Sequence, residues 1–167
     1  MGDIVKNIGL FLGLLLLQVM ILNKINFLGY GNPMLYILFI LVFPMKKDRS
    51  LFLILSFILG LCVDFFLDSG GINASASLLI AYIRLPVLKG LLNKTEIDFA
   101  VFKITNLPFL KLLSFIAIMV FVHHLAFFSL EYFSFKAILT ILSRTILTSI
   151  FTLILIIFSL LLMTKQK

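Results

Sequence analysis

The chain has 167 residues, 62% of them hydrophobic, and its 14 Lys and Arg against seven Asp and Glu give a formal net charge of +7. Long apolar runs separated by short polar breaks leave no room for a soluble domain. We therefore predict an all-α fold, a polytopic integral membrane helical bundle, with residues 1–167 forming a single transmembrane domain.

Six apolar segments are long enough, at about 1.5 Å rise per residue, to cross most of a hydrocarbon core about 30 Å thick. The second segment is the weakest, because Gly29, Gly31 and Pro33 interrupt its first half. We expect it to span the membrane, with a re-entrant segment as the alternative. The six predicted transmembrane helices are residues 8–22, 27–45, 51–67, 72–92, 109–130 and 137–163.

Basic residues gather in alternate gaps between these segments. With the N-terminus in the cytoplasm, only Lys24 and Lys136 fall outside, and Arg144 lies within the last segment. This bias predicts a multi-pass protein of the inner membrane with both termini cytoplasmic. Orientation and contact with membrane lipids explain the charge, so we expect no nucleic acid partner. The inner segments hold the other eleven basic residues, Lys6, Lys46, Lys47, Arg49, Arg84, Lys89, Lys94, Lys103, Lys111, Lys165 and Lys167.

Several kinds of chemical site are not indicated. A single cysteine, Cys62, allows neither a disulfide framework nor a cysteine metal site. His123 and His124 are adjacent and point about 100° apart on a helix, unlike the i, i+4 spacing of paired metal ligands. The sequence has no Gly-rich phosphate loop, nucleophile elbow or zinc motif. We therefore expect no metal, no cofactor and no catalytic residue.

Small residues at helical spacing predict close helix packing, for which lipid supplies no hydrophobic drive. Gly9 and Gly13 form such a pair in the first segment, and Ser77 and Ala81 form one in the fourth. Gly60 is assigned the same role in the third. We expect these residues to pack within the bundle, with a contact between subunits as the alternative.

Ionisable and polar groups within the segments collect in the outer third of the predicted bundle. Four fall about 8–12 Å below the outer surface, and three stand near that surface. Such residues usually face the bundle interior and are candidates for function. The cluster comprises Asp64, His123, His124 and Arg144 at depth, with Asp68, Asn73 and Glu131 nearer the surface.

The cluster has one structural interpretation and three functional ones. In the structural interpretation, an Asp64–Arg144 ion pair fixes the third segment against the sixth, and the histidines donate to backbone or hydroxyl groups. Asp64 and Asp68, at i and i+4, would share the inward face of one helix. The functional alternatives are an outward-facing ligand pocket, a proton relay through the histidines, and a surface for protein docking.

Residues 93–108 form the only long connection. Ile97, Val101 and Ile104 lie at i, i+4 and i+7, which predicts a helix on the inner membrane surface. This segment is the main candidate surface for a cytoplasmic partner, and a solvated connector is the alternative.

The stretch from Gly60 to Ala76, GLCVDFFLDSGGINASA, resembles the signature of the MreD family, the rod shape-determining membrane proteins of bacteria. That family carries a G-L-x-x-D run, a short outer turn with Gly, and then a polar residue and Ala that open the next span. Residues 123–125, 130–135 and 142–144 look like the Bacteroidetes branch of the same family.

This resemblance implies a non-enzymatic subunit of the cell-elongation machinery in the bacterial cytoplasmic membrane. It would scaffold or regulate lateral peptidoglycan synthesis and rod shape. Its direct partner would be MreC, a single-span protein with a periplasmic domain. Through that complex it would meet MreB filaments, a RodA-type glycan polymerase and a class B penicillin-binding protein.

The family fold is also thought to be similar to that of the S components of vitamin importers. This similarity supplies the alternative function, a small-molecule-binding subunit of a membrane importer. Against it, the chain has no Trp and its predicted outer loops are very short, which leaves little to cap a water-soluble vitamin.

Overall fold

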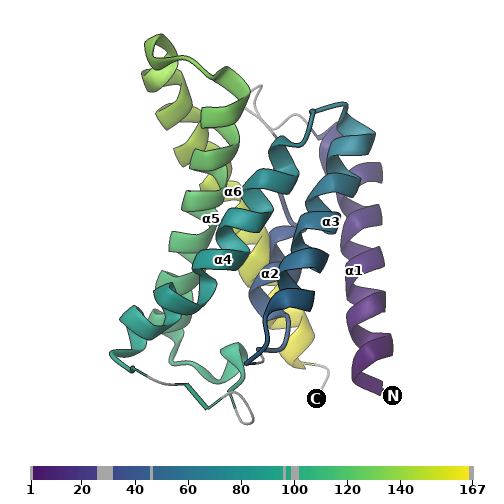
Figure 1. The fold of residues 1–167 in the computed structure, drawn as a ribbon, viewed down its shortest axis with the longest axis vertical. Helices are drawn as coiled ribbons and strands as arrows, with labels where there is room; N and C mark the ends of the chain where they lie inside the picture. Colours follow the sequence, from purple (N-terminus) through teal and green to yellow (C-terminus); the bar gives the residue numbers. More distant parts are fainter. Residues whose placement is uncertain (1, 26–31, 46, 96, 99–101, 166–167) are drawn as a thin grey trace.

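The computed structural model describes residues 2–25, 32–45, 47–95, 97–98 and 102–165, and these form a helical bundle (Figure 1). The predicted fold class, an all-α membrane bundle, is confirmed. The long helices are α1 (Gly2–Met20), α3 (Ser50–Leu67), α4 (Ile72–Leu92), α5 (Phe109–Tyr132) and α6 (Ile138–Lys165), and the short helical elements are α2 (Ile37–Val42), η1 (Leu22–Lys24), η2 (Ile104–Asn106) and η3 (Phe135–Ala137).

Five helices are long and apolar enough, by length and composition, to cross a membrane, so the chain is a multi-pass membrane protein. Each lies within a few residues of a predicted segment, except that α1 begins at Gly2. Helices are the expected solution, because a lipid-exposed backbone must bond all its N–H and C=O groups within the segment.

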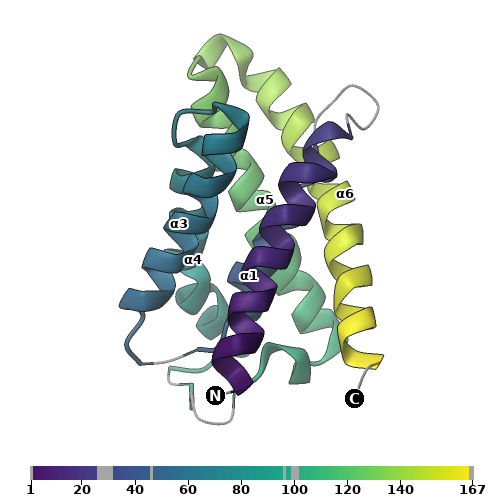
Figure 2. The same cartoon turned by 90° about the vertical axis from the view of Figure 1, so that its right-hand side faces the viewer.

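The second predicted segment, residues 27–45, does not form a spanning helix. Its helical part is α2, six residues long, which covers only about 9 Å at 1.5 Å per residue. Residues 26–31 lie outside the described part of the chain. The chain nevertheless returns through the interior from the upper end of α1 to the lower end of α3, so both termini lie at one end (Figures 1 and 2).

The lower half of the interior is apolar and is built around α2. Its side chains from Ile37 to Leu41 are all buried. The Phe39 ring lies edge-on to Phe11 of α1 at 5.3 Å between centroids, and Phe43 stacks on Phe52 of α3 at 5.4 Å. Since every face of α2 touches protein, the helix is a core element and not a lipid-facing one.

Gly60 lies in a close contact between α3 and α4. A Cβ atom built on Gly60 would stand 2.6 Å from the backbone of both Asn73 and Ala74, closer than real atoms come. On the facing helix, Ser77 and Ala81 are fully buried. These three residues therefore lie in close contacts inside the bundle.

Gly9 and Gly13 face away from the bundle, contrary to the packing predicted for them. Both are exposed, and a Cβ on either would meet nothing within 4 Å. The reason is that α1 turns its other face inward, where Leu14, Leu15 and Gln18 are buried.

The long connection between α4 and α5 is not the predicted helix. Of its described residues, only Ile104–Asn106 are helical, as a single 3-10 turn. Ile97 and Ile104 are nonetheless buried against the hydrophobic core, and Val101 lies outside the described residues. The apolar side chains thus cover the lower end of the interior, because irregular backbone places them there without helical periodicity.

Candidate functional site

Asp64 joins the end of α3 to the start of α4. Its carboxylate is 3% exposed and accepts the backbone N–H groups of Asn73, at 2.9 Å, and Ala74, at 2.8 Å. It also accepts the Ser69 hydroxyl at 2.6 Å. The first N–H groups of a helix have no partner within it, and the positive end of the helix dipole favours an anion. Asp64 is therefore a cap for α4 that the preceding helix supplies.

The predicted ion pair between Asp64 and Arg144 is wrong. The acceptor positions of the Asp64 carboxylate are taken by Ser69 and by the start of α4. Arg144 instead lies over the Tyr132 ring, with its guanidinium carbon 5.6 Å from the ring centroid. Across the part of the chain that the structure describes, its guanidinium makes neither an ion pair nor a hydrogen bond.

A directed chain of hydrogen bonds runs from Asp64 to His123. The Asn73 Nδ2 donates to the Asp64 carboxylate at 2.9 Å, which orients the amide so that its Oδ1 accepts from the Tyr36 hydroxyl, also at 2.9 Å. Having donated its one proton, the Tyr36 oxygen accepts from Nε2 of His123 at 2.9 Å. The Asp64 carboxylate thereby fixes the orientation of the Asn73 amide. The amide in turn fixes the direction of the Tyr36 hydroxyl proton, and the hydroxyl fixes the tautomer of His123.

Gln18 of α1 holds the non-helical backbone that precedes α2. Its Nε2 donates to the Pro33 carbonyl at 3.0 Å, and its Oε1 accepts the N–H groups of Leu35 at 2.8 Å and Tyr36 at 3.4 Å. The side chain is 1% exposed. One buried amide thus bonds three backbone groups of this non-helical stretch.

Thr152 of α6 holds the same backbone from the other side. Its hydroxyl oxygen accepts the Met34 N–H at 3.1 Å and lies 3.2 Å from Nε2 of His124. The other nitrogen of His124, Nδ1, lies 2.9 Å from the Val120 carbonyl, which only accepts. Nδ1 therefore carries the proton, and the Thr152 hydroxyl donates to Nε2.

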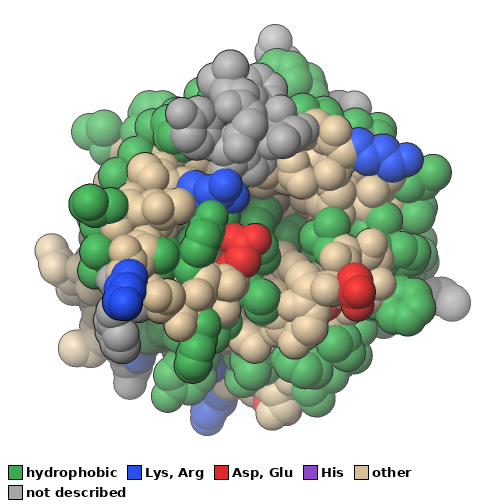
Figure 3. Space-filling model, turned by 90° about the horizontal axis from the view of Figure 1, so that it is seen from above, with side chains coloured by type: hydrophobic (Ala, Val, Ile, Leu, Met, Phe, Trp, Pro, Cys, Tyr) green, Lys and Arg blue, Asp and Glu red, His purple; other side chains and the backbone are tan. Residues whose placement is uncertain are grey.

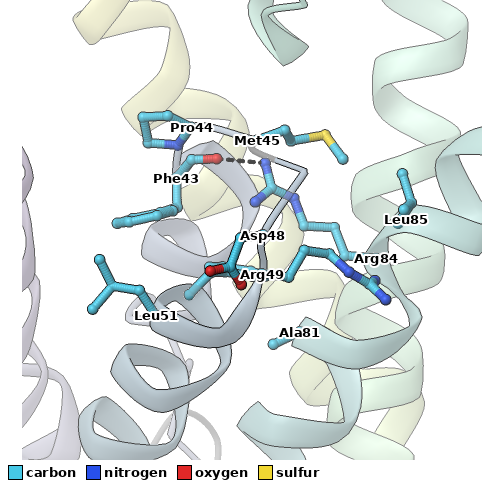
Figure 4. Close-up of a pocket in the computed structure, with 10 residues that line it drawn as sticks. Phe43, Pro44, Met45, Asp48, Arg49, Leu51, Ala81, Arg84 and Leu85 are labelled. Carbon is cyan, nitrogen blue, oxygen red and sulfur yellow. Dashed lines mark hydrogen bonds between the residues drawn. The ribbon is translucent and has the colours of Figure 1, made fainter. Parts of the chain in front are cut away.

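Arg84 of α4 holds the lower end of α2 (Figure 4). Its Nη2 donates to the carbonyls of Leu41 at 2.8 Å and Phe43 at 2.7 Å, and the guanidinium lies 5.0 Å above the Phe52 ring. A cation stabilises the end of a helix, where the last carbonyls lack partners. Arg84 was predicted to lie in one of the inner connections. This prediction is wrong, because Arg84 lies within α4 and is buried there.

The cavity beside Arg84 is too small for an organic ligand, at about 40 Å³. Asp48 stands at its edge and accepts the Ser50 N–H at 2.9 Å, which lowers the pKa of the Asp48 carboxyl. This cavity is therefore not a candidate ligand site.

The polar side chains together explain how broken backbone lies at membrane depth. Irregular backbone is tolerated there only where protein or water satisfies it, and here protein side chains do so. The residues that do most of this work were not among the predicted site residues. Gln18 is the lone polar side chain of a long apolar run, and α6 carries a buried polar stripe at i, i+3, i+4 and i+7, so both signals were visible in the sequence. The missed residues that bond the broken backbone are Gln18, Arg84 and Thr152. Tyr36 was also missed, and its hydroxyl bonds to Asn73 and His123. The rest of the α6 stripe comprises Thr148, whose hydroxyl donates to the Arg144 carbonyl, and Thr145 and Ser149, whose hydroxyls have no partner among the described residues.

A pocket of about 490 Å³ lies above this network, at the upper end of the bundle. Figure 3 looks onto that end and shows a hollow among hydrophobic, basic and acidic side chains. Glu131 of α5 and Arg144 of α6 are its two charged residues. The other lining residues are Gln18, Asn23, Asn32, Met34, Tyr36, Val63, Leu67, Ser69, Asn73, Phe127 and Phe128.

The predicted polar residues fall into three groups. Asp64, Asn73, His123 and His124 are buried in the network, which Asn73 shares with the pocket wall. Glu131 and Arg144 belong to the pocket alone. Asp68 belongs to neither, because α3 ends there with a left-handed φ of 52° that turns its side chain out to an exposed position.

Among the described residues, no three His, Cys, Asp or Glu side chains lie together so that they could hold a metal ion. No family model, curated protein or solved structure matches the chain. The resemblance to MreD and the similarity to S components therefore stay predictions from the sequence.

Proposed function

We propose that this chain is a non-enzymatic integral subunit of the bacterial cell-elongation machinery, which binds MreC directly and through it acts on lateral peptidoglycan synthesis. The observation that carries the proposal is the use of the family-like stretch from Gly60 to Asn73. Gly60 allows the close approach of α3 and α4, and Asp64 caps α4. This stretch thus forms the hairpin of α3 and α4, which suits a scaffold. The Asp64 carboxylate is hydrogen-bonded within the hairpin, and this favours a structural role for it over a catalytic one.

Depletion in the bacterium that carries the gene tests this proposal. We expect rod-shaped cells to become round, and a tagged chain to co-purify with MreC from membranes. Re-expression of the wild type restores the rods, and a Gly13→Ala variant, changed on an outward-facing position, does so equally. A normal cell outline after depletion contradicts the proposal.

The proposed orientation places the lower end of the bundle in the cytoplasm. Both termini and the basic connections lie at that end, and positive charge is retained inside. In a Cys62→Ser background, a cysteine at Asn93 should resist an impermeant thiol reagent in intact cells, and one at Ser69 should react. Labelling at position 93 from outside reverses the orientation.

The second candidate function is a small-molecule-binding subunit of a membrane importer. The upper pocket favours it, since about 490 Å³ lies within the usual range of small-ligand sites. If depletion leaves the cell shape unchanged and abolishes uptake of a vitamin, this second function is favoured.

A further inference from the structure

The upper pocket contains polar groups that the fold does not use. Gln18 and Asn73 line it, but their amides are already bonded to the broken backbone and to Asp64. Arg144 and Glu131, by contrast, make no hydrogen bond or ion pair with any described residue. The Asn23 Nδ2 is buried there without a partner. The free groups are thus two donors, one of them cationic, and one anionic acceptor.

The charged pair is held apart. Glu131 and Arg144 influence each other electrostatically, yet they do not approach to ion-pair distance. The Arg144 guanidinium lies over the Tyr132 ring, which keeps it at the pocket wall instead of out in solvent. An arginine so oriented presents its fork of N–H groups to a carboxylate or a phosphate.

Part of the pocket wall is apolar, beside the polar network described above. Met34, Val63, Phe127 and Phe128 line it and are each at least nine-tenths buried, whereas Glu131 is exposed at the mouth. A bound molecule would therefore place a hydrocarbon or ring body against these apolar side chains and a charged head beside Arg144. The pocket is too small for a partner's helix, which is about 10–12 Å across with its side chains.

From this geometry we infer that the pocket binds a small amphiphile whose anionic head, a carboxylate or a phosphate, is held by Arg144 and Asn23, with its apolar body against Met34, Val63, Phe127 and Phe128. Glu131 accepts a hydrogen bond from a donor on the ligand and disfavours molecules with a second negative charge. The site rests on the pocket alone and not on the proposed binding of MreC.

The test uses the full chain in phosphatidylcholine nanodiscs, titrated calorimetrically with octanoate, octyl phosphate and octylammonium. Saturable binding of at least one anion, and none of the cation, is expected. Arg144→Gln should weaken that binding by about 10–100-fold, the range of a lost charge-assisted hydrogen bond. Arg49→Gln, the matched change at the lower end of the bundle, should leave it unaltered.

Glu131→Gln should strengthen anion binding several-fold, a gain that a misfolded protein cannot produce. Adding phosphatidylglycerol to the nanodiscs distinguishes the two sources of the anionic head. If this lipid competes with the added anion, the natural ligand is a lipid headgroup, and if it does not compete, the natural ligand is a soluble anion. The inference is overturned if neither anion binds saturably, if octylammonium binds as well as they do, or if the Arg144→Gln and Arg49→Gln variants lose affinity alike. None of these outcomes bears on whether MreC co-purifies.

Discussion

Arg84 in the lower half of the interior and Arg144 in the upper half differ in whether the fold binds their guanidinium groups. In the lower half, Arg84 is buried and its guanidinium is bonded to the end of α2. In the upper half, Arg144 lines an open pocket and bonds to no described residue. Both arginines lie within apolar helices, so their place in the sequence does not separate them. What separates them is whether the fold has already used their donors, and this decides which charge is available to a ligand.

The largest expected effect comes from breaking the cap of α4. Asp64→Asn replaces an acceptor oxygen by a donor opposite N–H and O–H groups, which should cost about 3 kcal/mol of unfolding free energy. Unfolding of the purified protein in detergent, titrated with SDS, measures this. Asp68→Asn is the matched control, one turn away and exposed, and should change stability by less than about 0.5 kcal/mol. Equal losses would mean that the cap does not stabilise the fold.

Arg84→Met sharpens the contrast between the two arginines. It leaves the carbonyls of Leu41 and Phe43 without their donor and should cost about 2 kcal/mol, because unsatisfied buried acceptors are expensive. Arg144→Met should cost less than about 0.5 kcal/mol in the same SDS titration. If the order is reversed, Arg144 has a structural role that its contacts do not reveal.

Gly60→Ala tests the close contact between α3 and α4 against the open face of α1. The added methyl group would meet backbone at 2.6 Å, and overpacking of this kind costs about 1–3 kcal/mol. Gly13→Ala meets nothing within 4 Å and should be neutral or slightly stabilising, since Ala favours a helix more than Gly does. The comparison is made on thermal unfolding temperatures in one detergent. A destabilising Gly13→Ala would indicate a contact between chains on α1.

The smallest expected effect is the coupling between Asp64 and Arg144. Residues that share no contact behave additively, so the double variant Asp64→Asn/Arg144→Gln should equal the sum of the single variants within about 0.5 kcal/mol. Free energies of unfolding for the four proteins close the cycle. A larger coupling energy would indicate that Asp64 and Arg144 do form the ion pair predicted from the sequence.

The sequence predicts the long helices well because each is a nearly continuous apolar run, and lipid allows such a run only one secondary structure. It predicts the buried positions of Asp64, His123 and His124 through their place within those runs. It does not predict their partners. Helix depth gives height along the membrane, but it gives neither the direction of a side chain nor the hydrogen bonds of neighbouring backbone. A cation was therefore predicted for Asp64, while its true partners were five to ten residues away along the same chain.

The prediction of a spanning helix over residues 27–45 was wrong for a different reason. A hydropathy window registers residues 34–43 as apolar, but it cannot tell a lipid-facing run from one that protein surrounds on every side. The distinction lay in the polar residues of other segments, Gln18, Arg84 and Thr152, whose partners are backbone atoms that no pattern of side chains reveals.

The enclosed position of α2 also sets an order for biogenesis. Residues 33–43 are too short and too irregular to partition into lipid as an independent helix, and the backbone groups that they do not bond among themselves are bonded by side chains of α1, α4 and α6. The five long helices must therefore enter the bilayer first, and the central segment can be enclosed only after α6 has been synthesised. Until then the backbone groups of the central segment that bond to α4 and α6 lack their partners.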